Sequence, residues 1–114
     1  MTDLFPDLTY GVLGAAREVA YKTTGREIAM AVSAIYNVPV RRIMGVSQER
    51  QDVNARHAAW WVAYETGRLT TVQLGKIFRR HHTTVVYGKR QAVARREREG
   101  EFRRITDKLV ERFG

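Results

Sequence analysis

Two helical patterns separated by a very tight turn dominate the chain between Thr70 and Arg98. Thr70 and Gln73 have the spacing of a capping box, in which the threonine caps a helix start and the glutamine returns to the cap's backbone amide. The short apolar pattern that follows ends at residues 79–81, and a longer basic helix begins near His82. Helices joined by so short a turn must cross steeply, so this stretch predicts a helix-turn-helix.

The remainder of the chain also favours helices. Only two prolines and little strand-type alternation occur, which predicts an all-α fold, a helical bundle around the helix-turn-helix. We expect these further helices at residues 24–36, 40–44, 52–66 and 102–113. A capping box at Thr24 and Glu27 opens the first of them, Asp52 caps the third, and Gly67 follows its end. Helical spacing places the following residues in the core: Ile28, Val32, Ile35, Ala55, Ala58, Ala59, Val62, Ala63, Val72, Leu74, Ile77, Phe78, Val85, Val86, Ala92, Val93, Phe102, Ile105, Leu109 and Phe113.

A length of 114 residues fits a single domain with one core. We divide it into an N-terminal extension, residues 1–24, and a main domain, residues 25–114, with the helix-turn-helix at about residues 70–98. An apolar stripe from Leu8 to Val19 predicts that the extension is helical. Two interpretations of it stay open. It is either a helix that completes the core, or a surface that docks RNA polymerase, a co-regulator or a second copy.

Basic charge is concentrated in the predicted helix-turn-helix. The chain has 20 Lys and Arg against 12 Asp and Glu, a net charge of +8, which indicates a polyanionic partner. Residues 76–98 carry eight basic residues against Glu97 alone, whereas residues 1–25 carry two basic and three acidic ones. The alternative interpretation of this charge run is a solvated helix face without a ligand.

Composition disfavours several classes of protein. The absence of cysteine excludes disulfides, cysteine-based zinc sites and thiol catalysis. No nucleophile stands beside a general base, so we predict that the chain is not an enzyme and uses no cofactor. Without a secretion signal or an apolar run of membrane length, we expect a cytoplasmic, nucleoid-associated protein that does not contact a membrane.

Two clusters have a second interpretation. His81 and His82 are candidate metal ligands, but neighbouring residues on a helix point in different directions, and we predict no metal site. Trp60, Trp61 and Tyr64 are more typical of a core than of a ligand box. Because residues next to each other on a helix lie about 100° apart, at least one of the two tryptophans must lie toward a flank.

The start of the second helix of the helix-turn-helix carries side chains that can recognise bases. That end of the helix points into the major groove, where it reaches base edges. Arginine can bond guanine twice, histidine can donate or accept, and threonine offers a hydroxyl and a methyl group. The predicted base-reading residues are Arg80, His81, His82, Thr83 and Thr84.

Further residues around this helix are spaced to reach phosphates on the walls of the groove. Such contacts supply affinity and register but carry no sequence information, so binding should weaken steeply with salt. The predicted phosphate contacts are Thr71, Lys76, Arg79, Tyr87, Lys89, Arg90 and Arg95.

From about Glu27 to Phe113 the sequence resembles the C-terminal DNA-binding domain of the bacterial replication initiator DnaA, a Trp-repressor-like helix-turn-helix. The resemblance rests on residues 28–37, on Val53-Asn-Ala-Arg-His57, on Leu74-Gly-Lys-Ile-Phe78 and above all on His82-Thr-Thr-Val85. It implies an initiator-like domain at residues 25–114 that binds double-stranded DNA. It also implies base reading by His82 and Thr83, and phosphate contacts from Arg56 and His57.

The chain departs from that family pattern at three places. His81 stands where the family signature carries an acid that accepts a hydrogen bond from a base, which predicts a changed DNA preference. The family reads the minor groove with an arginine from a basic stretch, and Arg50 is the candidate to replace it. The turn reads Arg79-Arg80 where glycines are usual.

The phosphate-binding motif of the initiator's ATPase module is absent from this sequence. We therefore predict a small transcription regulator, similar in plan to activators of phage-like or gene-transfer-agent clusters, rather than an initiator. Two alternatives stay open: a replication-control protein at initiator sites, and an adaptor that acts mainly through protein contacts. The sequence leaves the oligomeric state open.

Overall fold

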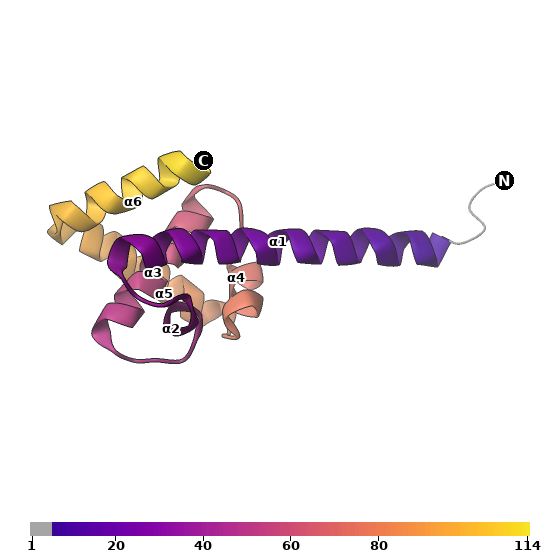
Figure 1. Cartoon of the computed structure of the whole chain (residues 1–114), viewed down its shortest axis with the longest axis horizontal. Coiled ribbons are helices and arrows are strands. Elements are labelled where there is room, and N and C mark those ends of the chain that lie inside the picture. Colours follow the sequence, from indigo (N-terminus) through magenta and orange to yellow (C-terminus); the bar gives the residue numbers. More distant parts are fainter. Residues whose placement is uncertain (1–5) are drawn as a thin grey trace.

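The computed structural model describes the backbone of residues 6–114 and the side chains from residue 19 onward. Over this part the chain contains helices and no strand, so the all-α prediction is confirmed (Figure 1). None of the described helices is both long and apolar enough to cross a membrane. The helices are α1 (Pro6–Tyr36), α2 (Val40–Met44), α3 (Arg50–Glu65), α4 (Thr71–Phe78), α5 (His82–Arg98) and α6 (Gly100–Phe113).

Helix α1 runs without a break through the position where a helix start was expected. The Thr24 hydroxyl donates to the carbonyl of Ala20 at 3.0 Å, one turn back, so it caps nothing and the predicted capping box is wrong. Leu8 lies outside the residues whose side chains are described, and Val19, the last residue of the expected stripe, is 64% exposed. The division of the chain at residue 24 stays a prediction.

The short elements after α1 follow the sequence closely. Helix α1 ends before Pro39, with Asn37 in the left-handed region at φ 56°, and α2 covers the expected residues 40–44 before Gly45. Helix α3 begins at Arg50 rather than at an Asp52 cap. Asp52 lies inside the first turn, fully buried, and accepts a hydrogen bond from Ser47 at 2.6 Å. The aspartate therefore ties the preceding loop to α3.

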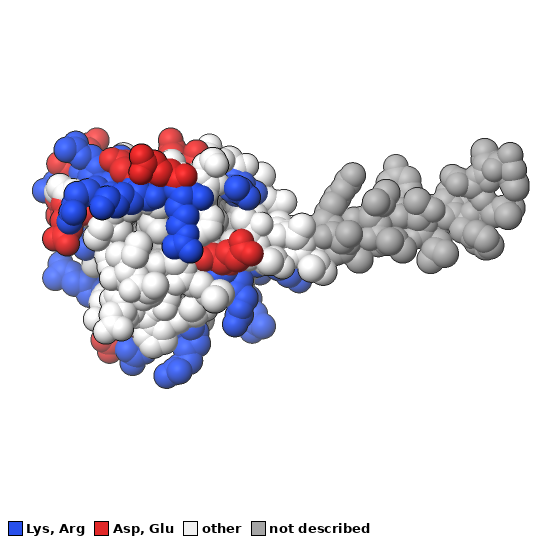
Figure 2. Space-filling model, turned by 45° about the horizontal axis from the view of Figure 1, so that its top comes forward, with Lys and Arg blue, Asp and Glu red and all other residues white. Residues whose placement is uncertain are grey.

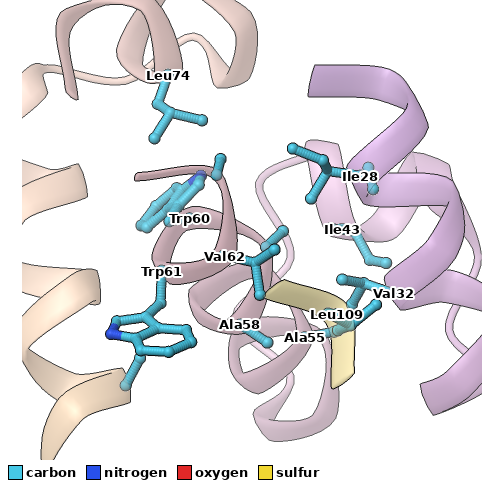
Figure 3. Packing of buried hydrophobic residues seen from close by; sticks show 14 of the residues in the cluster. Ile28, Val32, Ile43, Ala55, Ala58, Trp60, Trp61, Val62, Leu74 and Leu109 are labelled. Carbon is cyan, nitrogen blue, oxygen red and sulfur yellow. The ribbon is translucent and has the colours of Figure 1, made fainter. Parts of the chain in front are cut away.

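Helix α3 is the centre of the core. Its small residues, such as Ala55 and Ala58, leave room for α1 to pack closely, and Val62 faces Ile28 and Val32 of α1 (Figure 3). Both tryptophans of α3 point away from α1 and are buried (Figure 3).

The two tryptophans have different neighbours. Trp60 packs edge-on against Phe78 of α4, with ring centres 5.6 Å apart. Trp61 lies nearer a flank, where the guanidinium of Arg96 covers its ring at 4.0 Å. The two tryptophans are therefore core residues, as expected, whereas Tyr64 is 46% exposed and its expected place in the core is wrong. Helix α3 contacts α1 with one face and α5 with another.

Three expected core residues are exposed instead. Ile35 at the end of α1 is 45% exposed, Val72 in the first turn of α4 is 52% exposed, and Val93 on α5 is 45% exposed. Helical spacing predicts which face of a helix is apolar, but the packing of neighbouring helices decides how many residues of that face are buried. Val38, in the loop after α1, is buried although it was not expected to be.

Gly88 of α5 lies directly against the ring of Trp60, and we expect that no larger residue fits there. A Cβ atom at this position would lie 2.4 Å from Cε3 of Trp60. We predict that Gly88→Ala lowers the free energy of unfolding by about 1–3 kcal/mol, because an overpacked core must shift α5. Urea unfolding measures the change.

The matched control is Gly100→Ala, since a Cβ atom at Gly100 meets nothing within 4 Å. We expect this variant to keep the stability of the parent or to gain up to about 1 kcal/mol. Equal losses in the two alanine variants would contradict the steric explanation.

Candidate nucleic-acid interface

Helix α4 begins and ends as a helix-turn-helix requires. The expected capping box is present: Gln73 N donates to Thr70 Oγ1 at 3.1 Å, and Thr70 N donates to Gln73 Oε1 at 3.0 Å. At the other end Arg79 adopts the left-handed conformation, φ 56° and ψ 48°, and Arg80 N donates to the carbonyl of Gly75 at 2.8 Å. A Cβ atom at Gly75 would lie 2.6 Å from the carbonyl oxygen of Arg80, so this glycine permits the tight turn.

Helix α5 begins at His82, as predicted, and His81 is its cap. The Nδ1 atom of His81 accepts a hydrogen bond from the backbone N of Thr83 at 3.3 Å and lies 2.8 Å from its hydroxyl. The rings of His81 and His82 lie against one another, with centres 4.3 Å apart. His82, Thr83 and Thr84 are exposed. The first turn of α5 therefore presents an ordered set of polar side chains to the outside.

Arg80, predicted to read bases, makes hydrogen bonds inside the protein. Its guanidinium donates to the carbonyls of Phe78 at 2.9 Å and Gly45 at 2.6 Å and lies 5.8 Å from the ring centre of Trp60. These contacts tie the turn before α5 to the loop after α2. Arg80 thus holds this loop in place. To contact a base, the Arg80 side chain would have to break its hydrogen bonds to both carbonyls.

Arg56, predicted to contact phosphate, is buried and is only 2% exposed. Its guanidinium donates to the carbonyls of Ile43 at 2.7 Å, Arg42 at 2.8 Å and Ser47 at 3.0 Å. Burial lowers its pKa to about 10, with a further contribution from the nearby charge of Arg80. A side chain in this position does not reach the surface. Arg56 therefore holds the end of α2 and the loop after it in place, and does not make the expected phosphate contact.

The remaining predicted phosphate contacts differ in exposure. Lys76, Arg79, Tyr87 and Arg90 are exposed, and Thr71 is half-buried. The ammonium of Lys89 lies 3.0 Å from the ring centre of Tyr64, so a cation–π contact holds it against α3.

Two further predicted contacts lie apart from the first turn of α5. Arg50 is exposed at the start of α3, where it lines a hollow together with Asn54, Arg95, Arg98 and Glu99. Arg95 donates to Glu99 at 2.9 Å and lies over the ring of Phe102 at 4.5 Å. The structure thus brings Arg50 near the end of α5, rather than near its start.

His57 is half-buried beside Trp60, with ring centres 5.6 Å apart. Burial lowers its pKa to about 4, and the positive charges of Arg56, Arg95 and Arg80 lower it further. The imidazole is therefore neutral at pH 7. Any phosphate contact that it makes uses a neutral N–H group.

Charge on α6 is nearly balanced, in contrast to α5. Acidic and basic side chains are interspersed along the upper part of the face in Figure 2, where α6 lies. Helix α6 carries four basic and three acidic residues, whereas α5 carries five basic residues against Glu97 alone. Of these two helices, α5, whose first turn is exposed and polar, thus carries the larger excess of positive charge.

Comparison with known proteins agrees with this geometry. Residues 26–91 match the family model described as the bacterial DnaA protein helix-turn-helix. Relatives include chromosomal replication initiator protein DnaA 1 of Chlamydia trachomatis serovar D, 30% identical over 93% of this chain, and DnaA 2 of Chlamydia caviae, 32% identical over 82%. The chain spans only 24% and 20% of the length of these two relatives.

The neutral state of His57 makes stability depend on pH. The unfolded chain binds a proton at this residue near pH 6.5, and the folded chain binds it only near pH 4. The contribution of His57 is thus fully present above about pH 6.5 and is lost as pH falls toward 4. We predict that His57→Gln removes about 1–3 kcal/mol of this acid sensitivity, measured by urea unfolding from pH 4 to pH 7. Parallel stability curves for the two proteins would contradict it.

Arg79 combines a left-handed backbone conformation with a charged side chain, and substitutions can test separately what each does to stability and to DNA binding. Glycine adopts this conformation without the steric cost that arginine carries, so we predict that Arg79→Gly raises the unfolding free energy by about 0.5–1 kcal/mol. If Arg79 contacts a phosphate, the same change lowers the salt dependence of DNA binding by about one ion. Arg79→Asn is the control, because asparagine also removes the charge but tolerates the left-handed region. A loss of stability in Arg79→Gly would count against this account.

Proposed function

Because this chain belongs to the family of bacterial DnaA helix-turn-helix domains, we propose that it recognises a specific DNA sequence and acts as a small transcription regulator. The chain carries a DNA-binding helix-turn-helix, and double-stranded DNA is its partner. The observation that carries the proposal is the exposed, ordered first turn of α5, which lies inside the matched residues. A turn of this kind is what enters the major groove in helix-turn-helix proteins.

Base recognition in this proposal rests on His81, His82, Thr83 and Thr84. His81 uses Nδ1 to accept from the backbone of its own helix, which places the proton of the neutral ring on Nε2. The ring then offers a donor, where the family signature has an acid that can only accept. A donor selects bases with an acceptor in the major groove, such as guanine O6 or N7. We infer that His81 prefers a different base from the one that the acid of the family signature contacts.

Phosphate contacts in this proposal come from the exposed cations around α5. Lys76, Arg79 and Arg90 supply charge, and Thr71 and Tyr87 supply hydroxyl groups. Lys89 joins them only if its ammonium turns away from Tyr64. These contacts set the register of α5 on the duplex.

Transcription regulation is the proposal that needs no activity beyond DNA binding by the matched residues 26–91. The names of the DnaA relatives keep replication control at initiator sites as a second candidate. The N-terminal extension is proposed to contact RNA polymerase or a co-regulator. A regulator of this kind works on the nucleoid.

Selection of bound duplexes from a random pool tests this proposal. We expect one preferred sequence, whose symmetry reports whether one copy or two copies bind. Recovery of the initiator's own sites favours replication control, and recovery of no preferred sequence contradicts specific recognition altogether.

Single substitutions then separate base contacts from phosphate contacts. We predict that His82→Ala or Thr83→Ala weakens the selected duplex by about 1–3 kcal/mol and relaxes one base position. Arg90→Ala should weaken all duplexes alike and lower the salt slope by about one. Arg104→Ala on α6 is the matched control, because it removes an exposed arginine from a helix of nearly balanced charge. Equal losses on selected and random DNA for His82→Ala and Arg90→Ala would contradict the division.

A further inference from the structure

A cavity of about 430 Å³ lies between α3 and α5, beside the exposed face of the reading helix. Its size is in the range of small-molecule sites. The residues that line it include four arginines and no aspartate or glutamate. The polar residues of the lining are Gln48, Asn54, Arg56, His57, Arg80, Thr84, Tyr87, Gln91, Arg95 and Arg98.

The positive charge of this cavity is compensated only in part, because Glu99, next to the lining, pairs with Arg95 at 2.9 Å. Arg56 and Arg80 use their guanidinium groups on backbone carbonyls, which are neutral acceptors. Burial depresses the pKa of His57 in the same lining, and the charges of Arg56, Arg95 and Arg80 depress it further. With four arginines in the lining and one neighbouring carboxylate, the cavity keeps an excess of positive charge, which favours an anion.

Arg95 carries a donor that the protein does not satisfy. Its Nε atom donates to Glu99 at 2.9 Å, and its guanidinium lies over Phe102, but its Nη1 atom is buried without a hydrogen-bond partner. The indole Nε1 of Trp60, whose ring lines the same cavity, is also buried without a partner. Burial of an unpaired charged donor is costly, and such a group is a reason to look for a ligand.

We propose that the cavity between α3 and α5 is a binding site for a phosphate group, held by Arg95 and Arg98 with the side-chain amides of Asn54 and Gln91. Guanidinium groups suit the geometry of phosphate, and the amide N–H groups complete a set of donors. The phosphate belongs either to a free phosphate-bearing small molecule or to the backbone of bound DNA. Only the second source rests on the proposed function.

Occupation of this site bears on DNA reading because Thr84 and Tyr87 of α5 line the same cavity. A bound phosphate bridges α3 and α5 and neutralises charge behind the exposed first turn. A free ligand would therefore change the affinity for DNA, whereas a backbone phosphate would add a contact beside the base-reading residue Thr84.

Titration of the full chain with inorganic phosphate and with pyrophosphate, followed by nitrogen NMR at constant ionic strength, tests the site without DNA. We expect saturable shifts of the Asn54, Gln91 and Arg95 side-chain signals, and chloride should not reproduce them. Arg95→Gln should weaken the binding at least tenfold. Arg104→Gln on α6 removes the same charge at a distance and should leave the binding unchanged.

The source of the phosphate is decided by a second measurement, ethylation interference on the selected duplex. Saturable binding of free phosphate or pyrophosphate supports the small-molecule source. One duplex phosphate whose ethylation interferes with the parent protein but not with Arg95→Gln supports the backbone source.

The proposal is overturned if the shifts are unsaturable and identical in Arg95→Gln and no duplex phosphate depends on Arg95. If Arg95→Gln fails to fold, Arg98→Gln takes its place, because Arg98 is exposed and lies outside the core. If the phosphate shifts are unsaturable and specific DNA binding is unchanged in both Arg95→Gln and Arg98→Gln, this site is refuted and the proposed function still stands. Loss of specific DNA binding by the parent chain itself refutes the proposed function instead.

Discussion

The contact between Gly88 and Trp60 holds the reading helix where the rest of the structure needs it. Trp60 also packs against Phe78 of α4 and His57 of α3, and lies near Arg80 of the turn, so one indole touches every part of the helix-turn-helix. A ring this large is a rigid spacer with a fixed shape. Because α5 has no side chain at the contact point, its backbone lies directly on α3. The direction of the reading helix follows from that approach.

Two arginines extend this rigidity to the loop after α2. Arg56 bonds the carbonyls on one side of the loop and Arg80 bonds Gly45 from the turn before α5. Each bond satisfies a carbonyl that no helix satisfies, and charged donors make such bonds stronger than neutral ones. The loop and the first turn of α5 are thereby fixed relative to one another. A protein that reads DNA with both elements would need that fixed spacing.

Much of the site could be predicted because its signals are local. The capping box at Thr70, the turn at residues 79–81 and the start of α5 at His82 depend on residues within four positions of one another. The roles of Arg56, Arg80 and Arg95 could not be predicted in this way. In a sequence, an arginine near a basic helix is typical of a phosphate contact. Only its partners far away in the chain show whether the side chain is buried and bonded to carbonyls or exposed and free to bind phosphate.

Spacing along the chain was enough to predict the helical class, the helix-turn-helix, the family and the polar start of the reading helix. These features rest on spacing along the chain and on caps, which act over one or two turns. The packing of the helices was needed to show that α1 continues through Thr24 and that Ile35, Val72 and Val93 face outward. It also showed that a positively charged cavity lies beside the contact between α3 and α5. Burial and charge compensation depend on residues far apart in the chain, because packing between helices, and not spacing along one helix, sets them.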